Sequence, residues 1–319
     1  MENRTIKQLA GEFVMYKRSN GYDYNRGAYH LEKYVVFATS LMPSVNIPVK
    51  ETVTAFMDKY TNTPGSLYNL VAVIREFSRY LINRGYCGAY LIPAKRVSLP
   101  TPVQPYFFTE EEINIFFEAC DHIDANSRYM GRHIIIPAMY RILYCCGLRC
   151  KEARALSCKN VHLNKGYMDI LQSKGPKSRR VYISEELTEY LKKYDRKIST
   201  LFPGRKTFFP NKKDNPYCAT MLEQNFYKIW YGSFPEKKDS GVSIRVYDFR
   251  HHFVYANMNR WLREGKDVNA MLPYLMKYMG HSEIKNTLYY FHLIPDIYGV
   301  IVEKSLPSED LIPEVLDEK

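Results

Sequence analysis

Four prolines interrupt the chain within residues 93–106, and this break limits the possible folds more than any other feature. They are Pro93, Pro100, Pro102 and Pro105, in a stretch without apolar periodicity. Proline fixes φ and lacks a backbone N–H, so neither a helix nor a central strand continues through such a segment. The composition favours an extended linker. We therefore expect two domains, residues 1–94 and 107–300, a linker over 95–106 and a C-terminal tail over 301–319.

The first domain is predicted to be helical. Apolar residues recur with the helical period in residues 31–42 and 70–86, and Gly85 is placed to end the second of these helices. Arg75, Arg79 and Arg84 fall on the polar flank of that helix at spacings of four and five. They are either a solvated helix face or a surface that contacts DNA phosphates, and the pattern leaves both interpretations open.

The second domain mixes helices with a short hairpin. Thr109 followed by three glutamates is a capping-box start, and the apolar segment 133–147 predicts a buried helix ended by Gly147. The period then changes: residues 167–172 and 179–184 are expected to form two strands around a turn at Gly175 and Pro176. Helices return from residue 185. The fold class is therefore mainly α with a small antiparallel β-sheet.

The charge distribution favours a polyanionic partner. Residues 1–107 carry 13 Lys and Arg against 7 Asp and Glu, and residues 108–300 carry 30 against 21. The tail has 2 against 6 and is acidic. Two basic units in series suit a polyanion gripped from two sides. No apolar stretch is long enough to span a membrane, and the first residues lack a signal peptide, so we expect a cytoplasmic protein that does not bind membranes. The seven cysteines form no zinc-like spacing, and no metal site is expected.

Four separated motifs carry the functional signal. GLRCKEARAL contains Arg149 and Glu152, the predicted hairpin turn contains Lys174, YDFRHHF contains Arg250, and MGHSEIKNTLYY contains His281 and Tyr290. In this order and at these spacings, the sequence resembles the tyrosine recombinase (phage integrase) family over essentially the whole chain. The resemblance implies a helical core-binding domain that clamps DNA, followed by a mixed α+β catalytic domain.

The resemblance also implies a role for each matching residue. Arg149 and Arg250 match the two catalytic arginines, Glu152 the acid that steadies the first arginine, Lys174 the hairpin lysine, His281 the histidine of the GH box, and Tyr290 the nucleophile. Lys177 is the rival of Lys174, and Tyr289 is the rival of Tyr290. Arg75, Arg79, Arg84, Lys177 and Arg179 are expected to contact DNA.

One position departs from the family pattern, because Tyr247 stands where the family has a histidine. A phenol, with a pKa of about 10, can donate a hydrogen bond to phosphate but is a poor general base. His281 or His251 is expected to cover proton transfer instead.

The chemistry explains why these residue types belong together. Attack of a tyrosine oxygen on a phosphodiester places extra negative charge on the non-bridging oxygens, which two guanidinium groups can hold bidentately. A lysine can protonate the departing 5′-oxygen. Neither a metal nor another cofactor is required.

The predicted function is a site-specific DNA recombinase, an integrase or transposase of a mobile element that acts through a 3′-phosphotyrosine. The resemblance implies a homotetramer on double-stranded DNA, with the tail docking on a neighbouring subunit. Two alternatives remain: a catalytically inactive DNA-binding or architectural protein on the same fold, and relaxation of DNA like a type IB topoisomerase.

Overall fold

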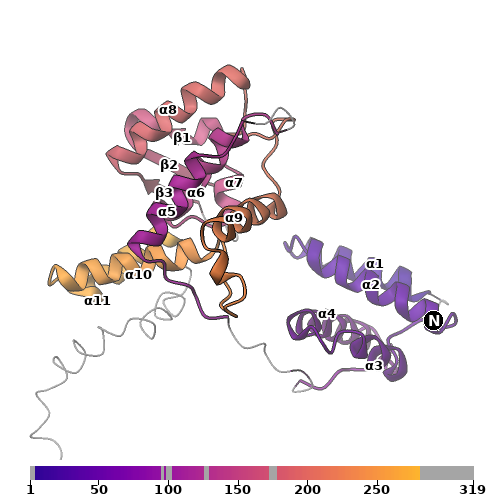
Figure 1. Cartoon of the computed structure of the whole chain (residues 1–319). Coiled ribbons are helices and arrows are strands. Elements are labelled where there is room, and N and C mark those ends of the chain that lie inside the picture. The colour runs from indigo at the N-terminus through magenta and orange to yellow at the C-terminus, as the bar shows by residue number, and fades with distance from the viewer. Residues whose placement is uncertain (1–3, 95–96, 98–102, 126–128, 172–177, 281–319) are drawn as a thin grey trace, which may run out of the picture. The chain divides into compact units, whose positions relative to one another are not determined.

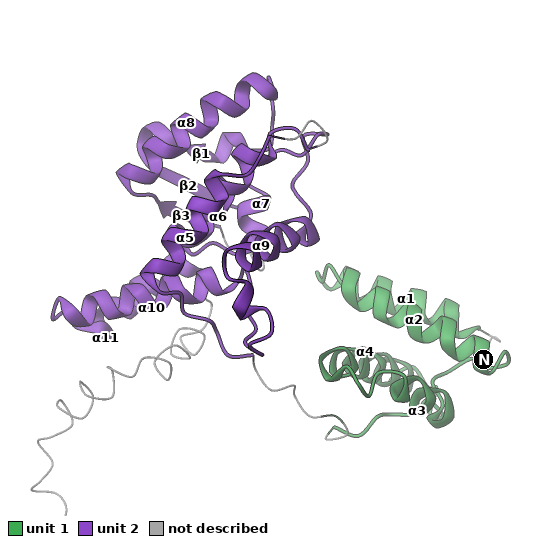
Figure 2. Cartoon of the chain, viewed as in Figure 1, with its two compact units in different colours: residues 1–102 green, residues 103–319 purple. Residues whose placement is uncertain are grey.

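The computed structural model of the chain describes residues 4–94, 97, 103–125, 129–171 and 178–280. Contacts divide the chain into unit 1, residues 1–102, and unit 2, residues 103–319 (Figure 2). No helix within the described ranges is long and apolar enough to cross a membrane.

Unit 1 is a group of helices around an aromatic core. Its helices are α1 (Ile6–Ser19), α2 (Asn25–Leu41), α3 (Lys50–Asp58) and α4 (Pro64–Ile82). The ring of Phe13 on α1 lies 5.5 Å from that of Phe77 and 5.1 Å from that of Tyr80, both on α4. Burying a large apolar side chain contributes roughly 1.5–3 kcal/mol. The helices expected from apolar periodicity are α2 and α4, and Gly85 takes a φ of +89° just beyond the end of α4.

Unit 2 is mainly helical and is built around α6 (Arg132–Cys146), which packs against other helices on several sides (Figure 1). The helices of this unit are α5 (Glu110–Asp121), α6, α7 (Cys150–Arg154), α8 (Glu185–Leu201), α9 (Ala219–Ser233), α10 (Asp248–Arg263) and α11 (Val268–Met279). Helix α5 begins at the capping box: the Thr109 hydroxyl accepts from the N–H of Glu112, and the Glu112 carboxylate accepts from the N–H of Thr109. Helix α6 packs against α5, α8 and α10, which explains its apolar residues on every face.

A three-stranded antiparallel sheet lies beside these helices, in the order β1 (Val161–His162), β2 (Tyr167–Ile170) and β3 (Arg179–Tyr182). The β2–β3 hairpin confirms the change of period seen in the sequence. Met168 pairs with Val181 and both are buried, whereas Asp169 pairs with Arg180 on the outer face. Strand β1 was not expected, because two residues are too few to display a period. The short 3-10 turns Cys158–Asn160, Leu163–Lys165 and Pro235–Lys237 complete the described elements of this unit.

Helix α11 brings the end of the described chain against the sheet. It contacts both α10 and β3. The ring of Tyr278 on α11 stacks on that of Phe253 on α10, with centroids 5.5 Å apart, and the Tyr278 hydroxyl donates to the carbonyl of Tyr182. The last carbonyls of α11 therefore lie close to both β3 and α10.

Candidate active site

Arg149 stands at the start of α7, where the chain has just turned out of α6. Gly147 ends α6 in the left-handed region with a φ of +58°, and Arg149 occupies the N-cap position of α7. Its guanidinium Nη1 donates to Glu152 Oε1 at 2.7 Å, and its backbone N–H donates to Glu152 Oε2 at 2.9 Å. A cation at a helix N-terminus is unfavourable, so the carboxylate one turn later stabilises Arg149 in this place.

Arg250 lies in the first turn of α10 and is almost completely buried, with 1% of its surface exposed. Nη1 donates to the carbonyl of Gly147 at 2.6 Å and Nη2 donates to the carbonyl of Met279 at 2.7 Å. Arg250 thus connects α10, the turn before Arg149 and the end of α11.

Three arginines converge on the last carbonyls of α11. The carbonyl of Tyr278 accepts from Arg179 Nε at 2.7 Å, that of Met279 accepts from Arg250, and that of Gly280 accepts from Arg149 Nη2 at 3.1 Å. The last carbonyls of a helix have no partner within the helix and carry its negative partial charge. These carbonyls therefore accept hydrogen bonds from the guanidinium groups, in addition to those that the Glu152 carboxylate accepts.

Among the described residues, this cluster brings three guanidinium groups and one carboxylate together at the residue directly before His281. Glu152 pairs with Arg149 and Arg179, whereas Arg250 donates to the carbonyls of Gly147 and Met279. An anion with several oxygens, such as a phosphate, can accept charge-assisted hydrogen bonds from guanidinium groups gathered in this way. The arrangement is therefore suited to hold a phosphodiester.

Tyr247 and His251 lie next to the buried arginine. Their rings meet edge to face with centroids 4.9 Å apart, and Tyr247 is 39% exposed. Burial, together with Arg245 and Arg250, lowers the pKa of His251 to about 4. His251 is therefore neutral at pH 7.

Arg245 and Asp248 are functional neighbours that sequence reasoning missed. The Asp248 carboxylate is buried and accepts from Arg245 Nη2 and from the N–H of Arg245, both at 2.7 Å. This pair fixes the turn that enters α10 and so the direction in which Arg250 leaves the helix. The signal was available, because an arginine three residues before an aspartate at a helix start is a local pattern.

Arg179, which is predicted to contact DNA, bonds within the protein. Its side chain is 9% exposed, and its Nη1 and Nη2 donate to Oε1 and Oε2 of Glu152 at 2.9 and 2.8 Å. The alternation along β3 could have found this, because Arg179 shares a face with the buried Val181 while Arg180 points outward.

Arg75 also bonds within the protein. Its Nε donates to the carbonyl of Ile92 at 3.0 Å and its Nη2 to that of Pro93 at 2.8 Å, so it holds the segment after α4. Arg79 and Arg84 are exposed, and Arg84 lies over the ring of Tyr80, 4.4 Å from its centroid. Of the three cations on this part of unit 1, the last two are thus the ones open to solvent.

Four of the expected site residues lie outside the described residues. They are Lys174, Lys177, His281 and Tyr290. The tail over 301–319 lies outside them as well.

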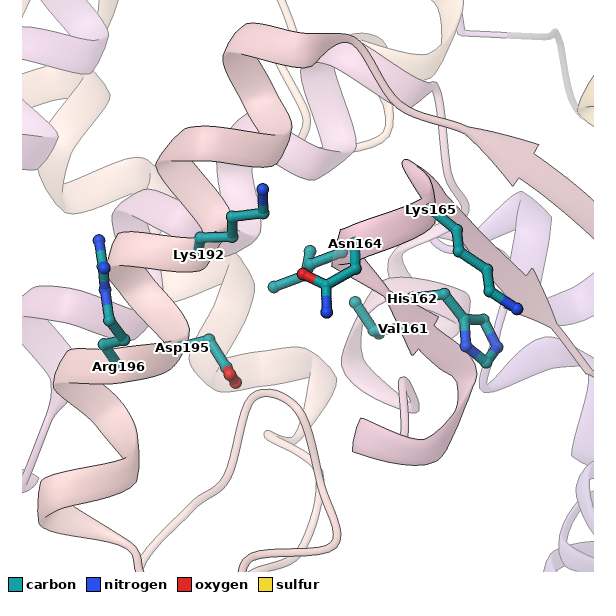
Figure 3. A pocket seen from close by; sticks show the side chains of 8 residues that line it. Val161, His162, Asn164, Lys165, Lys192, Asp195 and Arg196 are labelled. Atoms are coloured by element: carbon teal, nitrogen blue, oxygen red, sulfur yellow. The ribbon is translucent and has the colours of Figure 1, made fainter.

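A cavity of about 520 Å³ elsewhere in unit 2 is a poor anion site. It lies between α8 and residues 161–165 (Figure 3). The side chains of Lys165 and Arg196 extend away from the space, whereas Asn164 and the carboxylate of Asp195 turn toward it (Figure 3). Among the described residues, no group of three or more His, Cys, Asp and Glu side chains is placed to hold a metal ion.

Comparison with known proteins places the chain in one family. The sequence model of the phage integrase family matches residues 106–295. The integrase/recombinase y4rE of Sinorhizobium fredii is 24% identical over 308 residues, covering 95% of this chain and 96% of the relative. The tyrosine recombinase XerD of Pseudomonas putida is 26% identical and covers 72% of each chain.

A solved structure shares the fold. The XerH site-specific recombinase bound to its palindromic difH substrate, in a post-cleavage complex, superposes with a TM-score of 0.64. The sequence identity is 20%, and the match covers 96% of this chain and 85% of that structure. The fold class expected from the sequence is confirmed by this similarity and by the helices and small sheet described above.

Proposed function

The chain belongs to the phage integrase family, and from this premise we propose that it is a site-specific recombinase that cuts and rejoins double-stranded DNA through Tyr290. Members of this family are DNA strand-transferases of the tyrosine type, and this chain is an enzyme of that class. The observation that carries the proposal is the convergence of Arg149 and Arg250, from separate helices, at the end of α11 directly before His281.

The proposed reaction needs only side chains of this protein. The Tyr290 oxygen attacks the phosphorus, the bond from phosphorus to the 5′-oxygen breaks, and a 3′-phosphotyrosyl ester forms. Arg149 and Arg250 stabilise the charge on the non-bridging oxygens, and Lys174 donates a proton to the leaving 5′-oxygen. The phenol proton passes to a neutral histidine. His281 is the better candidate, because a pKa of about 4 makes His251 a weak base.

The reverse reaction joins strands. A different 5′-hydroxyl attacks the phosphotyrosyl ester, Tyr290 leaves, and the phosphodiester is restored with a new partner. The ester retains the energy of the broken bond, so no external energy source is needed. We assign this exchange to a mobile element, as an integrase or transposase, in line with the similarity to y4rE and with the Tyr247 departure.

Assembly on DNA completes the proposal. The similarity to a DNA-bound recombinase and the excess of Lys and Arg in both units support double-stranded DNA as the partner. We propose a homotetramer on paired sites, in which the acidic tail docks on a neighbouring subunit. Deleting residues 304–319 should weaken pairing of two sites and leave binding to one site unchanged. If the deletion leaves the pairing of two DNA sites unchanged, the tail does not dock on a neighbouring subunit.

The covalent intermediate is the decisive test. Purified protein is mixed in EDTA with nicked DNA that spans the ends of its own locus, and DNA attached to protein is measured after denaturation in hot detergent. Wild type and Tyr289→Phe should form the adduct, and Tyr290→Phe should not. If DNA that the protein binds gives no adduct, the inactive DNA-binding function takes first place. Relaxed plasmid without recombinant products would instead favour a topoisomerase.

A further inference from the structure

Glu152 is a buried carboxylate held by two arginines from different elements. Its side chain is 4% exposed, and Oε1 accepts from Arg149 Nη1 at 2.7 Å and from Arg179 Nη1 at 2.9 Å. Oε2 accepts from Arg179 Nη2 at 2.8 Å and from the N–H of Arg149. The Arg179 fork thus engages both oxygens, whereas the Arg149 guanidinium engages one. A bidentate guanidinium–carboxylate pair fixes the plane of the carboxylate.

Arg179 also reaches the end of α11. Its Nε donates to the carbonyl of Tyr278, two residues before the carbonyl of Gly280 that accepts from Arg149. A Cβ at Gly280 would lie 3.1 Å from Arg179 Nη1, so the close packing of this side chain depends on a glycine there. Arg179 therefore ties β3 to both α7 and α11.

Arg149 and Arg179 differ in how far their side chains are exposed to solvent. The side chain of Arg149 is 21% exposed and that of Arg179 is 9% exposed. The neighbouring Arg180 points to the other face of β3 and pairs with Asp169, with 46% of its side chain exposed. Arg149 is the member of the pair that an external phosphate reaches more readily.

We propose that Arg179 is a positioning residue, which fixes Glu152 and through it the guanidinium of Arg149 without contacting DNA. This inference rests on the proposed function. Without Arg179, Glu152 loses the fork that engages both of its oxygens and can rotate into a bidentate pair with Arg149. That pairing takes up N–H groups of Arg149 that would otherwise serve the phosphate. A lysine cannot replace the fork, because one ammonium does not span both carboxylate oxygens and the carbonyl of Tyr278.

The test compares Arg179→Met and Arg179→Lys with the matched control Arg180→Met, which removes the same charge from the other face of β3. Single-turnover cleavage is measured on nicked DNA with an ordinary scissile phosphate and with a methylphosphonate, in which a methyl group replaces one non-bridging oxygen. The neutral methylphosphonate needs less help from Arg149.

On ordinary DNA, both Arg179 variants should be slower by roughly 10- to 100-fold, the range for loss of a group that supports an electrostatic site. On the methylphosphonate the deficit should shrink severalfold. Arg180→Met should stay within about twofold of wild type on both substrates, as expected of an exposed pair. Equal slowing of the Arg179 variants on both substrates would mean a merely structural role and would overturn the proposal. If Arg179→Met does not fold, as judged by its thermal unfolding, Arg179→Lys carries the comparison.

DNA binding provides a second readout that does not need activity. The slope of log K against log salt should be the same for Arg179→Met, Arg179→Lys and wild type, because no phosphate contact is lost. A decrease of about one in its magnitude would show that Arg179 touches DNA and would overturn the proposal. If wild type binds DNA but cleaves neither substrate, the recombinase function fails, and the salt slope still decides whether Arg179 contacts DNA.

Discussion

Arg250 Nη1 donates to the carbonyl of Gly147 at 2.6 Å, across 103 positions of sequence. This bond connects the start of α10 with the turn from which Arg149 emerges two residues later. The two arginines that match the family's catalytic pair are therefore positioned relative to each other through the backbone of Gly147, two residues before Arg149.

Replacing Arg250 by Met should affect both stability and catalysis. The change leaves the carbonyls of Gly147 and Met279 without their partner, and each unsatisfied buried acceptor costs about 1–3 kcal/mol. We expect the free energy of unfolding to fall by about 2–4 kcal/mol and single-turnover cleavage to fall by at least about 100-fold. Urea unfolding and cleavage of nicked DNA measure the two effects. Arg260→Met, an exposed position on the same helix, should change neither by much; an equal loss there would contradict the assignment.

Gly147 should not tolerate a side chain. Its φ of +58° is unfavourable for an L-residue, and a Cβ would lie 2.7 Å from Cδ1 of Phe253, whose ring is stacked on Tyr278. Gly147→Ala should therefore lower the free energy of unfolding by about 2–4 kcal/mol. Gly204 has a φ of +69° and nothing within 4 Å of its Cβ position, so Gly204→Ala should cost only about 1 kcal/mol. If denaturant unfolding shows the same loss of free energy for both substitutions, the Phe253 ring moves aside without a measurable cost.

Stability should decline in mildly acidic solution. Burial lowers the pKa of His252 to about 4, from an ordinary value of 6.5. The unfolded histidine binds a proton between these two values and the folded one does not, so stability rises with pH across this window. The contribution of His252 to the free energy of unfolding is fully present above about pH 6.5. It is lost as the pH drops toward 4, by on the order of 1–3 kcal/mol.

Unfolding in urea at a series of pH values tests the histidine directly. His252→Gln should flatten the profile between pH 6.5 and 4, whereas His122→Gln, at the exposed end of α5, should leave it as in wild type. A profile that is the same in His252→Gln and wild type would assign the acid sensitivity to other groups. His251, with its pKa also lowered to about 4, is the next candidate.

The basic residues of unit 1 should differ in DNA binding. Arg79 and Arg84 are exposed, and each substitution to Ala should reduce the magnitude of the salt slope of DNA binding by about one. Arg75→Ala should leave the slope unchanged but destabilise unit 1, because the carbonyls of Ile92 and Pro93 lose their donor. Fluorescence anisotropy over a range of salt concentrations measures the slopes. A decrease of about one in the magnitude of the salt slope of Arg75→Ala would show that this side chain contacts a phosphate.

Local patterns in the sequence determined much of the fold. The capping box at Thr109, the glycine that ends α6 and the change of period at β2 and β3 all act between residues a few positions apart. Helix ends and strand alternation depend on such short-range bonds and on burial of one face, which composition and spacing display directly. The sequence pattern did not predict strand β1, because this strand has only two residues.

The partners of charged side chains that lie far apart in the sequence were decided by the tertiary structure. Sequence motifs singled out Arg149, Glu152 and Arg250. Arg179 and Arg75, which are predicted to contact DNA, bond within the protein. Arg179 lies 27 positions from Glu152 and 99 from Tyr278, and Arg75 lies 17 from Ile92. A guanidinium offers the same donors to a phosphate, a carboxylate or a helix-end carbonyl. Which acceptor it meets depends on how distant segments pack, and that information is absent from the spacing of residues along the chain.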